Sequence, residues 1–223
     1  MTASLSQLRI LRTLSVSDLV QEEILHLIKT GELVAGDKLN ELAFGKRFGI
    51  SRAPIREAFR ALEEAGLVKL EKNRGVYVRE ITEPEAHELY ELRASLDEMA
   101  GRMLAPRITA AELAELGDWL TRLTEAACRG DMAEYFPTNI GFHDRMVEMT
   151  GNATLLEFYR KVVDRMHLLR RRNFTVTHGS EVSQAEHRAI VEALATGDPA
   201  HAGASMRAHV TNGYRRLTAV LRR

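Results

Sequence analysis

Apolar positions recur with helical spacing over most of the chain and alternate as in strands in only one short region. Near the N-terminus, amphipathic stretches over 17–29 and 40–48 each end at a glycine, as helices often do. A third stretch runs from Ser51 to Gly66, and Ser17 and Ser51 stand where helix caps are expected. The pattern predicts three short helices, the last two joined by a tight turn.

Two β-prone runs follow the third helix. They are 67–71 and 76–78, and the sequence KNRG between them carries turn-forming residues. This arrangement predicts a hairpin. A hairpin placed after a helix-turn-helix is a wing, and Gly75 at its tip would allow a close approach of backbone to a ligand.

From residue 85 onward the pattern is helical throughout, so we expect a mainly α fold. It consists of an N-terminal winged helix-turn-helix and a C-terminal antiparallel all-helical bundle. The expected bundle helices cover 85–104, 109–129, 131–150, 152–174, 180–196 and 198–221. The expected domain organisation is an N-terminal arm (1–15), a winged helix-turn-helix domain (16–79), a linker (80–85) and a helical effector-binding and dimerisation domain (86–221).

Composition narrows the function. The chain has 31 Lys and Arg against 31 Asp and Glu, so affinity for nucleic acid must come from local placement of cations. Its single cysteine, Cys128, excludes a disulfide within the chain and fits a reducing cytoplasm. The sequence contains no apolar run near the roughly 18 residues of a membrane span.

The third helix carries three arginines on one face. Arg52, Arg56 and Arg60 are spaced four residues apart, and Ile55 and Phe59 lie on the opposite face. A recognition helix enters the major groove with its N-terminal residues against the bases. We therefore expect Arg52 to bind a guanine, Arg56 a base or a phosphate, and Arg60 a phosphate. A face that is merely solvated or salt-bridged is the alternative.

Three helices of the bundle each direct a histidine inward. Asn139 and His143 share a helix face, and His187 and His209 lie among apolar residues of two later helices. One inward histidine is usually a hydrogen-bonded core residue. Three together favour a divalent cation, because buried imidazoles without partners are costly and histidine binds zinc and nickel.

These two parts of the sequence resemble the domains of a known family. LNELAFGKRFGISRAPIREAFRALEEAGLV, with NRGVYV, resembles the winged-helix domain of the GntR family of bacterial transcription regulators. The rest resembles the FCD effector domain of the FadR subfamily, through ELRASLDEMAGRMLA, NIGFHDRMVEMTGNATL and EHRAIVEALATGDPAHAGASMRAHV. The resemblance implies a homodimer that binds a palindromic operator in double-stranded DNA. Ser51, Arg52 and Arg56 match family positions that contact DNA, and Gly75 matches the wing-tip glycine.

The resemblance also implies a metal site inside the bundle. Its ligands carry over to Asn139, His143, His187 and His209, with zinc expected first and nickel or manganese as alternatives. Asn139 departs from the usual aspartate. Four neutral ligands would bind the ion less tightly and leave its +2 charge for an anionic effector. Arg93 matches an arginine common in this domain and is a second candidate anchor for a carboxylate, unless an interhelical salt bridge occupies it.

These expectations combine into one functional prediction. The chain is a cytoplasmic DNA-binding regulator, more often a repressor in such groups, whose helical domain binds a small organic acid. Two alternatives remain open at this stage. One is a metal-dependent hydrolase that uses the histidine cluster, and the other is an architectural DNA-binding protein that responds to no effector.

Overall fold

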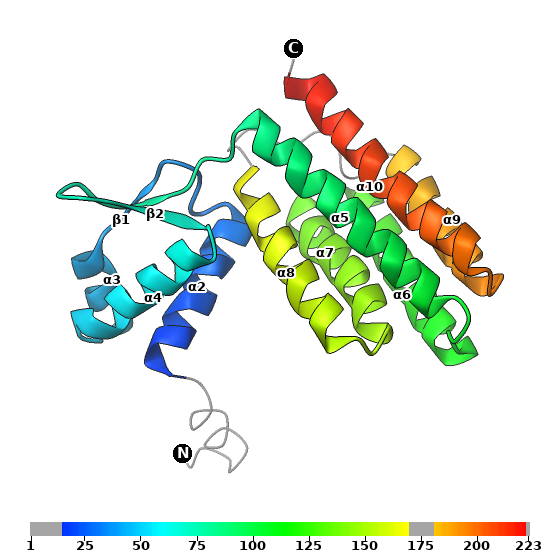
Figure 1. Cartoon of the computed structure of the whole chain (residues 1–223), viewed down its shortest axis with the longest axis horizontal. Helices are drawn as coiled ribbons and strands as arrows, with labels where there is room; N and C mark the ends of the chain where they lie inside the picture. The colour runs from blue at the N-terminus through cyan, green and yellow to red at the C-terminus, as the bar shows by residue number, and fades with distance from the viewer. Residues whose placement is uncertain (1–14, 170–180, 222–223) are drawn as a thin grey trace, which may run out of the picture. The chain divides into compact units, whose positions relative to one another are not determined.

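The computed structural model describes residues 15–169 and 181–221 (Figure 1). The expected N-terminal arm, apart from Ser15, therefore lies outside the described residues. Contacts divide the chain into two compact units. The first extends to Thr82 and includes a short stretch that begins at Asp164, and the second contains the remainder. The predicted fold class is confirmed.

The first unit contains the three predicted helices: α2 (Val16–Thr30), α3 (Glu41–Phe48) and α4 (Arg52–Glu64). Their ends lie within a residue or two of the predicted ones. The cap of α2 was predicted wrongly, because Ser15 and not Ser17 precedes the helix. The Ser15 hydroxyl accepts a hydrogen bond from the Asp18 amide, and the Asp18 carboxylate accepts one from the Ser15 amide.

The predicted hairpin is also confirmed. Strands β2 (Val68–Glu71) and β3 (Gly75–Val78) pair in antiparallel fashion, and the short strand β1 (Lys38–Leu39) joins the other edge of β3. Tyr77 of β3 stands between Lys38 of β1 and Lys69 of β2. Two cations therefore flank one aromatic ring across the wing.

Aromatic and aliphatic side chains form the core of this unit. Phe44 of α3 meets Phe59 of α4 edge to face at 6.1 Å between ring centroids, and Ile55 is fully buried beside them. Close packing explains the glycine at position 45, since a Cβ on Gly45 would lie 3.2 Å from the Ile50 carbonyl oxygen. The close turn between α3 and α4 thus requires glycine inside α3, despite the helix propensity that it costs.

Six helices follow in chain order. They are α5 (Glu83–Leu104), α6 (Ala110–Arg129), α7 (Met132–Met149), α8 (Ala153–Met166), α9 (Glu181–Ala195) and α10 (Pro199–Leu221). The α8 helix is shorter than the predicted 152–174 and ends in a 3₁₀ turn over His167–Leu169. None of the described helices is long and apolar enough to cross a membrane.

Helices α5 and α10 pack along much of their length and lie side by side in Figure 1. Two glycines allow the contact. A Cβ on Gly101 would lie 2.9 Å from the backbone carbonyl of Ala202, and one on Gly203 would lie 3.0 Å from the Glu98 carbonyl oxygen. The two backbones therefore touch directly, and this contact fixes the position of α10 and of the histidine that it carries.

Candidate DNA interface and metal centre

The exposed face of α4 carries the three predicted arginines. Arg52, Arg56 and Arg60 are all exposed, while Ile55 and Phe59 on the opposite face are buried. The Ser51 hydroxyl at the start of the helix makes no cap hydrogen bond, although serine at this position usually accepts one. The N-terminal end of α4 therefore presents polar groups to solvent.

The arginines differ in their partners. The Arg56 guanidinium donates a hydrogen bond from Nε to Oε2 of Glu41, at 2.9 Å. Among the residues that the structure describes, neither Arg52 nor Arg60 forms an ion pair. The role of Glu41 was not predicted from the sequence, because Glu41 lies on α3 and its partner Arg56 lies 15 residues further along, on α4.

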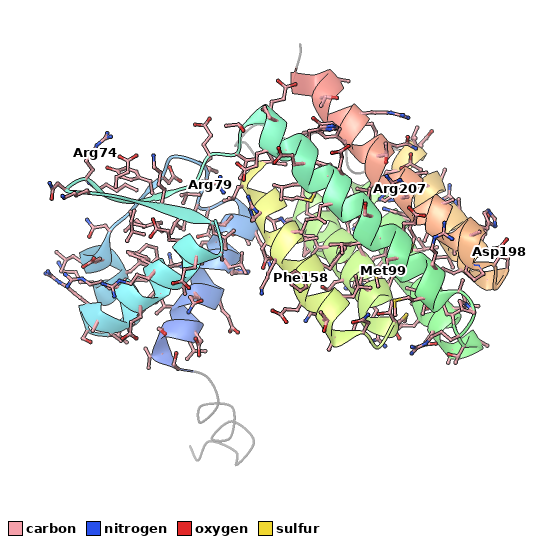
Figure 2. All side chains as sticks on the ribbon, viewed as in Figure 1. Arg74, Arg79, Met99, Phe158, Asp198 and Arg207 are labelled. Carbon is pink, nitrogen blue, oxygen red and sulfur yellow. The ribbon has the colours of Figure 1, made fainter. Side chains whose placement is uncertain are left out.

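The wing tip is built around Gly75. Its φ of +118° is a conformation that other residues rarely adopt, and Lys38 packs 3.1 Å from the place of a Cβ. Arg74, at the outer end of the hairpin in Figure 2, pairs with Glu71 at 2.8 Å.

Lys38 is a second residue that the sequence analysis missed. It is exposed, and its Nζ lies 5.6 Å from the centroid of the Tyr77 ring. Lys69, on the other side of the same ring, has Glu71 as a partner at 3.3 Å. Within the described ranges, Lys38 has no ion pair and so offers an uncompensated charge beside Gly75.

In the second unit, the structure brings three predicted histidines together. His143 of α7, His187 of α9 and His209 of α10 place their nearest ring nitrogens within 4.8 Å of one another. All three are buried, His187 completely. Asn139 lies one turn before His143 on the same helix and is partly buried. The donor set is thus three imidazoles with an amide on the neighbouring turn.

Burial favours the neutral form of two imidazoles in the cluster, those of His187 and His209. Burial lowers the pKa of His187 well below its usual value, and the nearby His209 lowers it further. Burial also lowers the pKa of His209, although the neighbouring Glu186 carboxylate opposes this shift. In the described part of the chain, neither ring nitrogen of His187 has a hydrogen-bond partner. A divalent cation would bind a nitrogen of His187 together with nitrogens of the two other converging imidazoles.

Glu186, next to His187 on α9, contacts one histidine of the cluster. Its Oε2 lies 2.9 Å from Nδ1 of His209, and Arg216 of α10 binds both carboxylate oxygens at 2.8 Å. Asn212 donates a further hydrogen bond to Oε1 at 3.0 Å. Burial by itself would raise the pKa of Glu186. The hydrogen bonds from His209 and Arg216 outweigh burial and bring this pKa to about 2.

Arg93 on α5 has a partner that differs from the expected interhelical one. Its Nε lies 3.4 Å from Oδ2 of Asp97, one turn further along the same helix, and its guanidinium lies 5.9 Å from the centroid of the Tyr159 ring. Asp97 is 1% exposed. Burial raises the pKa of Asp97 to about 6, against the opposing charge of Arg93. The Arg93 charge also lowers the pKa of His187 and His209, although burial is the larger cause for both.

The sequence analysis missed Glu186 and Asp97. Both were present in the quoted motifs, Glu186 directly before a histidine and Asp97 four residues after Arg93. Spacing predicted which residues share a helix face. It did not predict that Glu186 on α9 reaches across to a histidine on α10.

Comparison with known proteins identifies both units. Residues 16–78 match the family described as bacterial regulatory proteins, gntR family, and residues 88–212 match the FCD domain. HTH-type transcriptional regulator YdhC of Bacillus subtilis is 31% identical over 87% of this chain and 88% of its own length. The probable D-xylose utilization operon transcriptional repressor of Paenarthrobacter nicotinovorans is 29% identical over 91% of this chain and 88% of its own length.

A solved structure shows the same fold. The Escherichia coli protein McbR/YncC superposes with a TM-score of 0.83 at 20% identity, over 94% of this chain and 100% of that one. Both matched domains and the named relatives are those of transcription regulators, which excludes the metal-hydrolase alternative. The chain therefore belongs to the GntR family of bacterial transcription regulators, in the subfamily that carries the FCD domain.

Proposed function

We propose that this regulator is a repressor whose FCD domain binds a divalent metal ion and a small organic acid, and that the acid releases the operator. The observation that carries the proposal is the convergence of three buried imidazoles in the unit that does not contain the recognition helix. A repressor among its relatives supports the sign of regulation.

We assign one function to each of the domains predicted from the sequence. Residues 16–79 bind DNA, 80–85 link the two domains, and 86–221 bind the effector and dimerise. The arm over 1–15 is assigned no contact. The protein acts in the cytoplasm, where bacterial DNA is located.

We propose His143, His187 and His209 as metal ligands, with the Asn139 amide oxygen as the fourth. Zinc fits nitrogen donors in a four-coordinate site and is the first candidate, with nickel and manganese as alternatives. When bound, the ion supplies a positive centre that accepts a carboxylate oxygen. Because all four ligands are neutral, none of them offsets the charge that attracts an anion.

Arg93 is the proposed second anchor for the acid. A guanidinium holds a carboxylate through two parallel hydrogen bonds, and the lowering of the pKa of His187 and His209 by the Arg93 charge supports this assignment. Asp97 pairs with Nε of Arg93 at 3.4 Å. In the proposal, the effector carboxylate binds the Nη groups of the guanidinium and competes there with the side chain of Tyr159.

For DNA, we propose Ser51, Arg52, Arg56, Arg60 and Gly75 as contact residues. Arg52 reads a base, and Arg60 and the wing contact the phosphate backbone. Two copies of the chain read the two halves of a palindromic operator, so the proposal requires a homodimer.

Exposed apolar side chains of the second unit support an interface between copies. Leu92 and Met99 lie seven residues apart on one face of α5 and are 49% and 45% exposed. Phe158 of α8 is 55% exposed, and Figure 2 labels it with Met99. We expect Met99→Glu to convert the dimer to monomers in sedimentation experiments. Val182→Glu, at an exposed apolar position of α9, is the control; an equal effect of both variants would reject this face.

The metal is tested first, by elemental mass spectrometry of the protein purified without chelators. We expect about one zinc ion per chain in the wild type and none in His187→Ala. DNA binding by His187→Ala should persist, because the recognition helix lies in the other unit. Wild-type protein that holds no metal even after incubation with zinc would reject the proposed site.

The effector is tested by release of DNA selected from a random-sequence library. A panel of small carboxylic acids is added to the zinc-loaded protein, and at least one should release the DNA. Arg93→Gln should raise the half-maximal concentration of that acid by 10-fold or more, and Arg102→Gln, at a paired arginine further along α5, should not. Binding that no acid alters would favour the architectural alternative.

A further inference from the structure

We propose that Glu186 is a positioning residue for the metal centre: it fixes the tautomer of His209 so that Nε2 faces the other two histidines. The inference rests on the proposed metal site and adds a residue that is not itself a ligand. It also assigns Arg216 and Asn212 to the same task, because they hold Glu186 in place.

The chemistry of the carboxylate determines the tautomer. An ionised carboxylate only accepts hydrogen bonds, so the 2.9 Å contact between Oε2 of Glu186 and Nδ1 of His209 requires the proton to be on Nδ1. A neutral imidazole with its proton on Nδ1 has its lone pair on Nε2. That atom is then the metal donor, and its orientation is set before any ion arrives.

Arg216 keeps the carboxylate ionised and oriented. It binds both oxygens of Glu186 at 2.8 Å, in the two-pronged geometry that guanidinium and carboxylate favour. With Asn212 on Oε1 and His209 on Oε2, each oxygen accepts two hydrogen bonds. All acceptor positions of the Glu186 carboxylate are therefore used, and this set of hydrogen bonds fixes its orientation.

The four residues of this network come from two adjacent helices. Glu186 lies on α9, while His209, Asn212 and Arg216 follow one another at three- and four-residue spacing along one face of α10. His187, the next residue on α9, enters the cluster directly. The pair Glu186 and His187 therefore contributes one ligand and orients another.

The sharpest variant is Glu186→Gln, which keeps the size of the side chain. Its amide either donates to Nδ1 of His209 and moves the proton to Nε2, or presents its oxygen there and meets Arg216 with an NH₂ group. Both arrangements weaken the site. Zinc affinity, measured by competition with a chromogenic chelator, should fall about 10- to 100-fold.

The matched control is Glu98→Gln. Glu98 of α5 also accepts hydrogen bonds from two arginines, Arg102 and Arg207, the second of which is labelled on α10 in Figure 2. It contacts none of the three clustered histidines. Zinc affinity of Glu98→Gln should stay within about twofold of the wild type, and an equal loss in both variants would overturn the assignment.

A second measurement separates orientation from general damage to the fold. Long-range ¹H–¹⁵N spectra of the metal-free protein report which imidazole nitrogen carries the proton. His209 should show its proton on Nδ1 in the wild type and in Glu98→Gln, and should lose this preference in Glu186→Leu, whose side chain offers Nδ1 no acceptor. An unchanged His209 tautomer in Glu186→Leu would overturn the proposal.

The two readouts also distinguish this inference from the proposed function. A wild type that binds no zinc removes the metal site and rejects the proposed function. The spectrum of the metal-free variants still decides whether Glu186 sets the His209 tautomer.

Discussion

Arg56 and Glu41 join the two helices of the helix-turn-helix through a hydrogen bond of 2.9 Å from Nε to Oε2. The contact places a negative charge on the surface that we propose for DNA. The contact uses the Nε of Arg56. The Glu41 carboxylate weakens the attraction of this surface to DNA phosphates of any sequence. It also restrains the side chain of Arg56, which we propose contacts one position of the operator.

Removal of the Glu41 charge should therefore lower selectivity. We expect Glu41→Gln to bind random-sequence DNA about 3- to 10-fold more tightly at low salt, with a smaller gain on the selected operator. Fluorescence anisotropy with both DNAs measures the ratio. Glu57→Gln, which removes the same charge from exposed α4, should strengthen binding to both DNAs equally; a parallel change in Glu41→Gln would contradict the role of the Arg56 contact.

Arg52 and Arg60 should make different contributions to DNA binding. Arg52→Ala is expected to cost about 1–3 kcal/mol of operator affinity and to reduce discrimination at one base pair. Arg60→Ala should weaken all sequences alike and reduce the slope of log affinity against log salt by about 1. Affinities for a set of single-base operator variants at several salt concentrations test both. A changed base preference in Arg60→Ala would reverse our placement of the two side chains.

The two lysines that flank Tyr77 provide a matched pair in the wing. Lys38 has no ion pair within the described residues, whereas Glu71 partly neutralises Lys69. Lys38→Gln should reduce the salt slope of DNA binding by about 1, because one fewer counterion is released. Lys69→Gln should change it much less. Equal slopes for the wild type and Lys38→Gln would show that the β1 side of the wing makes no phosphate contact.

Asp97 predicts a pH dependence of stability. Its pKa in the folded protein is about 6, against 3.8 for an aspartate in water, so the folded state holds the proton more tightly than the unfolded state. Its contribution is therefore complete below about pH 4 and is lost as pH rises through 6. Relative to Asp97→Asn, the wild type should lose on the order of 2–3 kcal/mol of unfolding free energy between these limits.

Urea denaturation of the metal-free proteins at several pH values measures this difference. Loss of the Asp97 charge also affects Arg93, but by a constant amount, because the guanidinium stays charged over the whole range. Glu98→Gln, at the half-buried carboxylate next in sequence, should not reproduce the change, because hydrogen bonds from Arg102 and Arg207 lower the pKa of Glu98. Parallel curves for the wild type and Asp97→Asn would show that folding does not raise the pKa of Asp97.

Much of the fold followed from the sequence because its helices are strongly amphipathic and separated by glycines. The three histidines were predictable as inward-facing, since each occurs at helical spacing among apolar residues. Local capping was less predictable. Ser15 and Ser17 are both plausible caps, and the choice depends on Asp18, which completes the reciprocal hydrogen bonds with Ser15 alone.

The partners of the functional residues were not predictable. The contacts of Glu41 with Arg56, of Lys38 with Tyr77, and of Glu186 with His209 all join different elements. Sequence spacing fixes the face on which a side chain lies, but not which side chain of another element it meets. Asp97 and Arg93 share a helix and lie four residues apart, so that pair was accessible from spacing and was overlooked.

The glycine contact between α5 and α10 limits how this domain can change shape. Where two backbones touch at Gly101 and Gly203, sliding by even one residue would force a side chain into the space of a main chain. Arg93 and His209 therefore belong to a single rigid frame. An effector that alters the shape of the domain would do so by moving other helices against that frame, and a larger residue at Gly203 would damage the frame itself.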